Sequence, residues 1–297
     1  MSVTTEIGIV GLGLLGSALA QRLLGAGYAV LGFDIERARQ PALERMGGTF
    51  AISLPELAHR CRVMFVAVFD TEQVEAVVEG TLLPAVGSNS GKIILCASTC
   101  DPDRIAALAG RIAPQGLHLL ETPISGTSEQ VRQGRGVALI GGNPAKAEEV
   151  AAVLAAIFPS HFHMGPIGHA GRAKLAINLI LGLNRLALAE GLVFAERMQL
   201  EPERFLEVAR QAASYSQVMD SKGPKMLRGD FSPEGRARQT LKDFQLILAQ
   251  ARKVGQHLPL AVLNAQVLHS CVLNGEGDRD NSIVIEEIRR RCAGAPE

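Results

Sequence analysis

The chain has 297 residues, and its formal net charge is zero because 30 acidic residues balance 30 basic ones. That length suits two packed domains better than a single core. The charge balance excludes the strongly basic surfaces typical of nucleic-acid or membrane-surface binding, so we expect neither partner. Five cysteines include no CxxC pair, and residues 1–7 lack the pattern of a signal peptide. These features predict a cytoplasmic protein.

A glycine-rich motif lies between the first predicted strand and the first predicted helix. The apolar run 7–10 precedes it, a helical pattern over 17–24 follows it, and its residues are Gly11, Leu12, Gly13, Leu14, Leu15 and Gly16. In this GxGxxG context the glycines permit a tight turn, close approach of a pyrophosphate and close helix–strand packing. The amino end of the helix then offers free amides to phosphates. The motif predicts a dinucleotide cofactor.

Asp34 follows the second predicted strand, 29–33, near the interval of about twenty residues expected after the glycines. A carboxylate there can accept both ribose hydroxyls of NAD and repels the 2'-phosphate of NADP. We therefore expect NAD, with NADP possible because Arg37 and Arg39 stand close enough in sequence to pair with a phosphate. The alternative is that Asp34 caps a helix predicted over 36–43, which leaves the glycines unexplained.

Strands and helices continue to alternate through the amino-terminal half. The pattern predicts strands at 63–68, 92–97, 118–121 and 134–140, and helices near 54–59, 72–78, 104–112 and 145–157. This alternation is typical of the α/β class and predicts a Rossmann-type, doubly wound, mostly parallel sheet. His161 and His163 alternate with Phe162 as in a short strand, and no third ligand stands nearby in sequence, so we expect no metal.

Polar groups follow several of these strands. Because ligands of such sheets bind beyond the carboxyl ends of the strands, we expect the glycine motif, Asp34, Phe69-Asp70 and Ser98-Thr99 to line one cofactor crevice. Ser125, the amide of Gly126 and the hydroxyl of Thr127 form a further set of donors suited to a carboxylate. The alternative interpretation of this last loop is an ordinary turn.

The carboxyl-terminal half has only helical patterns. They run over about 170–198, 203–213, 238–254, 260–274 and 283–291. We therefore predict a dinucleotide-binding domain over 1–164 and an all-helical substrate-binding and oligomerisation domain over 165–297. The apolar stretch 175–195 contains Arg185 and Glu190, which favours a buried helix over a membrane span. Its apolar circumference suggests cover by another subunit, so we expect a homodimer or homotetramer.

Lys174 and Asn178 stand near the start of the first of these helices. Residues four positions apart share a helical face, so both side chains can point into one cleft. A lysine in the first turns of a helix is more often a solvated charge, and an asparagine there can serve packing alone. The spacing of the pair alone therefore does not indicate a catalytic role, and the surrounding motifs have to support it.

Taken together, the chain resembles the β-hydroxyacid dehydrogenase family. Residues 9–16 look like the family's opening dinucleotide motif, and residues 122–127, TPISGT, are similar to its substrate loop, (D/E)xPxSGG. The block 165–174, GPIGHAGRAK, with Asn178 matches its glycine-rich catalytic block. Residues 226–231, MLRGDF, and 241–243, LKD, resemble its closing segment, where an aromatic and a lysine lie near the nicotinamide.

The resemblance implies an NAD(P)-dependent enzyme that interconverts a small 3-hydroxy acid and its semialdehyde. Lys174 would be the acid–base group and Asn178 would orient the substrate. Ser125, Gly126 and Thr127 would hold the carboxylate of a small substrate. The implied cofactor contacts come from Gly11 to Gly16, Asp34, Phe69, Asp70, Ser98, Thr99, Phe231 and Lys242.

Four departures from the family pattern border the implied site. Leu179 replaces a frequent second asparagine, Phe69 replaces a proline, Thr127 replaces a glycine, and the usual aromatic after the GDF block is missing. Imine reductases resemble this architecture but usually lack the lysine, and phosphogluconate dehydrogenases have a much longer carboxyl-terminal domain. A non-catalytic dinucleotide-binding protein is the alternative from another class.

Overall fold

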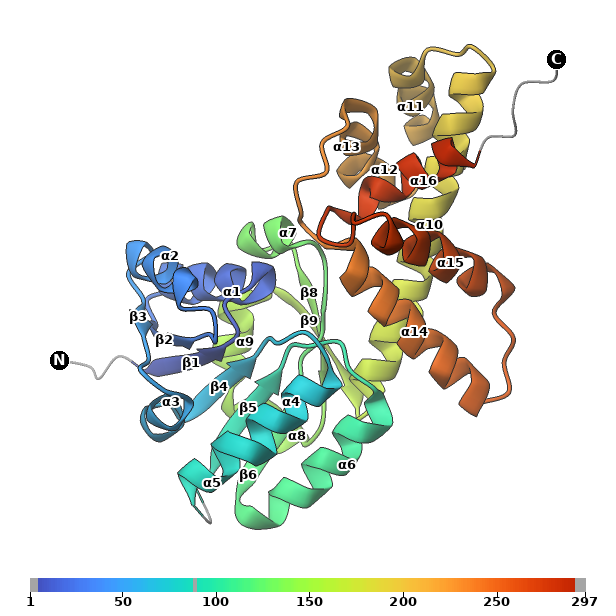
Figure 1. Cartoon of the computed structure of the whole chain (residues 1–297). Helices are drawn as coiled ribbons and strands as arrows, with labels where there is room; N and C mark the ends of the chain where they lie inside the picture. Colours follow the sequence, from blue (N-terminus) through green and yellow to red (C-terminus); the bar gives the residue numbers. More distant parts are fainter. Residues whose placement is uncertain (1–4, 88–89, 292–297) are drawn as a thin grey trace. The chain divides into compact units, whose positions relative to one another are not determined.

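The computed structural model describes residues 5–87 and 90–291. The chain divides into two compact units, residues 1–174 and 175–297. The opening residues 1–4, on which the expectation about a signal peptide partly rests, lie outside the described residues. Figure 1 follows the chain through both units. The predicted domain boundary at residue 164 falls at the end of the last strand.

The strands all belong to the first unit. In the described part of the chain they are β1 Glu6–Val10, β2 Ala29–Phe33, β3 Thr49–Phe50, β4 Val63–Val66, β5 Lys92–Cys96, β6 Leu117–Glu121, β7 Ile124–Ser125, β8 Val137–Gly141 and β9 Ser160–Gly165. They form one sheet in the order β3-β2-β1-β4-β5-β6-β8-β7, and β9 pairs with β8. The first six positions reproduce the Rossmann strand order.

Most strand pairs are parallel, as predicted. The pairs from β3 through β6 and the pair β8–β9 are parallel, whereas β8 runs antiparallel to β6 and β7. The parallel strands therefore end at one edge of the sheet, and the loops that follow them lie there.

Helices cover both faces of this sheet (Figure 1). They are α1 Leu14–Gly25, α2 Gln40–Arg45, α3 Leu54–Arg60, α4 Thr71–Val77, α5 Leu83–Val86, α6 Pro102–Ile112, α7 Ser128–Arg132, α8 Pro144–Glu149 and α9 Ala151–Ile157. Shorter helical turns are η1 Arg37–Arg39, η2 Val78–Leu82 and η3 Ala113–Gln115.

Two cores explain why the central strands are apolar runs without a polar face. Along β4, Val63 and Phe65 pack into the core beneath α1, α7 and α9, whereas Met64 and Val66 pack into the core beneath α3, α4 and α6. Strand β5 alternates in the same way. A strand buried on both faces needs apolar side chains at every position.

Several predicted elements differ from the structure. The helix expected over 36–43 is the turn η1 followed by α2, and the helix expected over 145–157 is interrupted at Val150, where φ is −112° and ψ is 8°. The two-residue strands β3 and β7 were not predicted, because a run of two residues shows no periodicity. The strand expected over 63–68 ends at Val66.

The second unit is helical. Its helices, with α10 beginning in the first unit, are α10 His169–Arg197, α11 Pro202–Gln211, α12 Gln217–Ser221, α13 Gly223–Arg228, α14 Ala237–Lys253, α15 Pro259–Leu273 and α16 Val284–Arg290, with the turn η4 Asn281–Ile283. Among its described residues, β-type pairing is limited to the isolated bridge between Arg236 and Asp280. Gly223 and Pro224 begin α13, since proline suits the first helical turn.

Helix α10 is long and apolar, as the sequence predicted. Its length and its mean hydropathy of 1.5 over 18 residues meet the criteria for a membrane span, and 44% of that stretch is buried. Core helices of water-soluble proteins meet the same criteria. Within the second unit its buried residues Leu186, Ala189 and Leu192 join a core with Phe244 of α14 and side chains of the other helices.

Gly182 lies where α10 closely approaches α14 and α15 in this core. A Cβ atom at position 182 would lie 2.4 Å from Cε2 of Phe244 and 3.0 Å from Nδ2 of Asn264. We therefore expect Gly182→Ala to lower the free energy of unfolding by about 1–3 kcal/mol, the usual cost of overpacking. Urea unfolding followed by circular dichroism measures the change.

Gly191→Ala on the same helix is the matched control, because a Cβ there meets no heavy atom within 4 Å. The control should raise stability by about 0.4–1 kcal/mol through the lower entropy of the unfolded chain. Equal effects of the two substitutions would contradict the packing argument.

Candidate active site

The glycine motif forms the turn from β1 into α1. Gly11 has φ +91°, and a Cβ there would lie 2.5 Å from the carbonyl oxygen of Ala67. A Cβ on Gly16 would lie 1.8 Å from the carbonyl oxygen of Gly11, so the helix can pack on the turn only with glycine. Gly13, which has no side chain, is the N-cap of α1. The first amides of the helix are thus directed at the sheet edge, which fits a phosphate ligand.

Asp34 is tied to this turn rather than to a helix. One carboxylate oxygen accepts from the amide of Leu12 at 2.7 Å and from Nη1 of Arg39 at 2.9 Å, and the other accepts from the amide of Glu36 at 2.8 Å. The N-cap of the following turn η1 is Glu36. The helix-cap alternative for Asp34 is therefore wrong, and its carboxylate lies beside the glycine motif.

Two further loops meet at the same edge. The Ser98 hydroxyl, after β5, accepts from the amide of Val68 at 3.0 Å and donates to the Val68 carbonyl at 2.8 Å. Ser98 thus fixes the segment that leads from β4 to Phe69 and Asp70. Phe69 is partly exposed, and Asp70 is the N-cap of α4, accepting from the amide of Gln73 at 2.9 Å. The side chain of Asp70 therefore has a structural role that the sequence analysis did not predict.

The loop expected to hold a carboxylate contains a short strand and a helix cap. Ser125 belongs to β7 and pairs with Val137 of β8, and Gly126 follows with φ +140°. Thr127 forms a capping box for α7: its hydroxyl accepts from the amide of Gln130 at 3.2 Å, while its own amide donates to the Gln130 side chain at 2.8 Å. The Thr127 amide is thus engaged within the helix start, and its hydroxyl oxygen already accepts one hydrogen bond.

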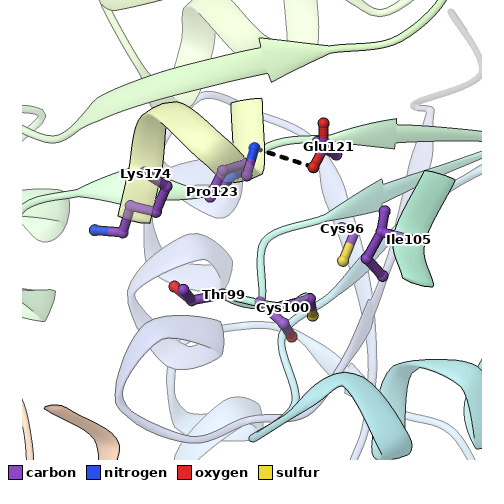
Figure 2. Close-up of a pocket in the computed structure, with 9 residues that line it drawn as sticks. Cys96, Thr99, Cys100, Ile105, Glu121, Pro123 and Lys174 are labelled. Atoms are coloured by element: carbon purple, nitrogen blue, oxygen red, sulfur yellow. Dashed lines mark hydrogen bonds between the residues drawn. The ribbon is translucent and has the colours of Figure 1, made fainter. Parts of the chain in front are cut away.

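A pocket lies where β5, β6 and the start of α10 meet (Figure 2). Its lining residues are Cys96, Ser98, Thr99, Cys100, Ile105, Glu121, Pro123, Gly171 and Lys174. Lys174 is buried, with 6% of its surface exposed. A hydrogen bond to Cys100 and burial together raise the pKa of the Cys96 thiol well above its usual range, so this thiol is a poor nucleophile. The other polar side chains that line the pocket are the amine of Lys174, the hydroxyls of Ser98 and Thr99, and the carboxylate of Glu121.

Glu121 also lines this pocket, and the sequence analysis gave it no role. It ends β6, and its two carboxylate oxygens accept from the amides of Gly168 at 2.6 Å and Gly171 at 3.0 Å. Burial raises the pKa of Glu121, and the amides of Gly168, Gly171 and Ala170 offset part of that rise. The available signal was its place at the acidic first position of the (D/E)xPxSGG pattern.

In the second unit, Asn178 and Lys242 share one carboxylate. Nδ2 of Asn178 donates to Oδ2 of Asp243 at 2.9 Å, and Nζ of Lys242 lies 3.0 Å from Oδ1 of the same residue. Asp243, to which the sequence analysis gave no separate role, therefore connects α10 and α14. Burial lowers the pKa of Arg185, further along α10, to about 10, although Asp280 and Asp243 act in the opposite direction.

A second buried carboxylate orders the loop that carries Phe231. Asp280 accepts from Nζ of Lys222 at 2.9 Å and from the amides of Glu234 and Gly235 at 2.9 and 3.2 Å. Its own amide donates to the Phe231 carbonyl at 2.9 Å. Burial raises the pKa of Asp280. Lys222 and the amides lower it by a larger amount, so the net shift is downward.

Across residues 5–87 and 90–291, no three histidine, cysteine, aspartate or glutamate side chains are grouped as a metal site would require. The first unit brings together the glycine motif with Asp34, and Ser98 and Thr99 with Lys174. The second brings together Asn178 and Lys242. These groups offer amide and hydroxyl donors, a carboxylate that can accept hydrogen bonds from ribose hydroxyls, and a buried amine.

Comparison with known proteins identifies the family. Residues 6–165 match the model of the NAD-binding domain of 6-phosphogluconate dehydrogenase, and residues 168–288 match that of the NAD-binding region of NADP-dependent 3-hydroxyisobutyrate dehydrogenase. L-threonate dehydrogenase from Cupriavidus necator is 32% identical over 289 residues, which is 96% of each chain. The chain belongs to the β-hydroxyacid dehydrogenase family. It is an NAD(P)-dependent hydroxyacid dehydrogenase.

Two further similarities agree with this assignment. Glyoxylate/succinic semialdehyde reductase 2 from Arabidopsis thaliana is 28% identical over 96% of this dehydrogenase and 80% of the plant protein. A crystal structure of 3-hydroxyisobutyrate dehydrogenase from Salmonella typhimurium superposes with a TM-score of 0.87 at 25% identity, covering 95% of this chain and 99% of that one. The Rossmann domain followed by a helical domain is thus confirmed.

Proposed function

We propose that this dehydrogenase transfers a hydride between a nicotinamide cofactor, preferably NAD, and C3 of a small 3-hydroxy acid, or reduces the matching semialdehyde. The observation that supports this most directly is the burial of Lys174 in a pocket at the carboxyl ends of β5 and β6. That pocket lies on the sheet edge that also carries the glycine motif and Asp34. A buried amine beside a dinucleotide site is suited to proton transfer.

In this mechanism the nicotinamide, when bound, supplies the hydride chemistry. Lys174 accepts the proton of the substrate hydroxyl during oxidation and returns it to the carbonyl oxygen during reduction. Asn178 orients the substrate, and Asp243 holds its amide in a fixed rotamer. Ser125, Gly126 and Thr127 bind the carboxylate through hydroxyl and amide donors.

We assign cofactor contacts to residues of each unit. Residues Gly11 to Gly16 and the amino end of α1 bind the pyrophosphate, and Asp34 accepts the adenosine ribose hydroxyls. Phe69, Asp70, Ser98 and Thr99 line the remaining crevice. Within the second unit, Phe231 and Lys242 are the residues that we assign to the nicotinamide, and the ion pair with Asp243 holds Lys242.

Two enzymatic alternatives are separated by experiment. Lys174 argues against an imine reductase, because that class usually lacks the lysine. Threonate, named by one relative, carries hydroxyls at both C2 and C3, so the position of oxidation has to be tested. A panel of three- to six-carbon 2-hydroxy acids, 3-hydroxy acids and semialdehydes, followed by NADH absorbance with both cofactors, distinguishes these cases. Oxidation of 2-hydroxy acids alone would contradict the C3 assignment.

Lys174→Ala should lower kcat by about 10²- to 10⁴-fold, because proton transfer loses its acid–base group. Lys174→Arg keeps the positive charge but cannot release its proton near neutral pH, so it should be equally impaired. Turnover of the best panel substrate and NADH binding by fluorescence are measured for each variant. NADH affinity should stay unchanged.

Lys146→Ala is the matched control, because Lys146 forms an ordinary surface ion pair with Glu149 at 2.6 Å. Its kcat should equal that of the wild type. Wild-type turnover in Lys174→Ala would refute the role of Lys174.

Asp34→Ser should shift the ratio of kcat/KM for NADP to that for NAD upward by at least about tenfold. The substitution removes the charge that repels a 2'-phosphate and frees Nη1 of Arg39, now 2.9 Å from Asp34, to pair with it. Adding Arg39→Ala to this variant should cancel much of the gain. An unchanged ratio would count against the ribose role of Asp34.

We also propose a homodimer or homotetramer. Helix α10 exposes Ile180 and Phe194, and α15 exposes Leu260 and Leu263, each with more than half of its surface accessible. Apolar side chains gathered on helices in this way are typical of subunit interfaces. Light scattering should give two or four times the chain mass of 31.6 kDa. Phe194→Glu should lower that mass, and a monomeric wild type would refute the proposal.

A further inference from the structure

Glu121 connects two segments that are far apart in sequence. Its carboxylate, at the end of β6, accepts from amides 47 and 50 residues further along the chain, those of Gly168 and Gly171. Only 4% of the residue surface is exposed. Figure 2 draws the contact with the first turn of α10 as a dashed line. The contact belongs wholly to the first unit.

These amides are the ones that a helix cannot satisfy by itself. The first amides of any helix lack partners within it, and the amino end of the helix is electropositive. The first turn of α10, His169 to Arg172, contains no acidic side chain of its own. Glu121 supplies the negative group from β6, and hydrogen bonds from amides to a carboxylate are stronger than those between neutral groups.

Glycines from two other elements leave the space that this carboxylate fills. A Cβ on Gly141 of β8 would lie 2.4 Å from Oε2 of Glu121, and a Cβ on Gly171 of α10 would lie 2.7 Å from Oε1. Any larger residue at either position would displace the carboxylate. Packing against these glycines therefore fixes the position of the Glu121 carboxylate in addition to the hydrogen bonds.

Lys174 follows Gly171 by about one helical turn and lines the same pocket. In Figure 2 the Lys174 side chain extends away from Glu121. A further side-chain contact at this turn is the exposed ion pair of Arg172 with Asp103 at 2.9 Å, and exposed pairs contribute little. The buried contact made by Glu121 therefore holds the turn from which the Lys174 side chain extends.

We propose that Glu121 is a positioning residue for Lys174: by holding the first turn of α10 against the end of β6, it sets where the lysine amine meets the substrate hydroxyl. This inference rests on the proposed function of Lys174. It assigns to the acidic residue of the substrate-loop pattern a role in the geometry of proton transfer, and none in substrate contact.

Glu121→Gln tests the proposal, because glutamine keeps the shape but replaces one acceptor oxygen with an NH2 group that cannot accept. Displacement of the lysine by a fraction of an ångström to 1 Å should lower kcat by about 10- to 100-fold. The KM for the hydroxy acid and the Kd for NADH should stay within about twofold. Amide hydrogen exchange of the peptide covering 166–174 should become faster, with peptides of β1 and α1 unchanged.

Asp103→Asn is the matched control, because it removes from α6 the carboxylate that forms the exposed ion pair with Arg172 on the same turn of α10. Its kcat and exchange should match the wild type. Gly171→Ala disturbs the Glu121 contact from the helix side and should reproduce the loss in kcat with Glu121 intact. The proposal is overturned if Glu121→Gln keeps kcat within twofold of the wild type, or if exchange at 166–174 is unchanged. Failure of the proposed function shows separately, as full turnover in Lys174→Ala, whereas the exchange measurement needs no turnover.

Discussion

Two hydrogen bonds, from the amides of Gly168 and Gly171 to Glu121, join the end of the sheet to the start of the longest helix. The arrangement of the first unit depends on such junctions at one edge. Parallel strands can place polar groups together only where they end, and each group here is held by a backbone contact to a neighbouring loop. Asp34 accepts from Leu12, and Ser98 bonds to Val68. The buried sheet positions the point where each loop begins, and these contacts fix the loops relative to one another.

Much of the fold could be predicted from the sequence, because a strand buried on both faces appears in the sequence as an uninterrupted apolar run. Strand β2 has the predicted bounds, since five apolar or small residues stand between turn residues. The long apolar pattern after Ala170 similarly corresponds to α10. Where tertiary pairing decides the structure, the sequence carries less information. Strand β7 exists because Ile124 and Ser125 meet β8, and no local pattern in two residues shows that.

The candidate site was predictable to a different degree in each part. Glycines at Gly11 and Gly16 answer steric demands of a local turn, so a motif could find them. Glu121 and Asp243 hold their partners over long sequence separations, and nothing near them indicates which amide or side chain they meet. Thr127 shows the reverse case: a hydroxyl expected to bind a ligand also caps a helix, because threonine serves both purposes.

The two glycines around Glu121 limit which substitutions this chain can accept. Gly141, Gly171 and Glu121 come from a strand, a helix and the end of another strand, yet they fill one volume. A methyl group gained at either glycine has to be matched by a shorter residue at 121, and a shorter residue at 121 alone leaves a void beside both. The three positions are therefore constrained as a set, so that substitutions tolerated one at a time elsewhere in the sheet are tolerated here only in combination. Other residues that line the pocket with Lys174, such as Cys96, Thr99 and Ile105, lie outside this set of three positions.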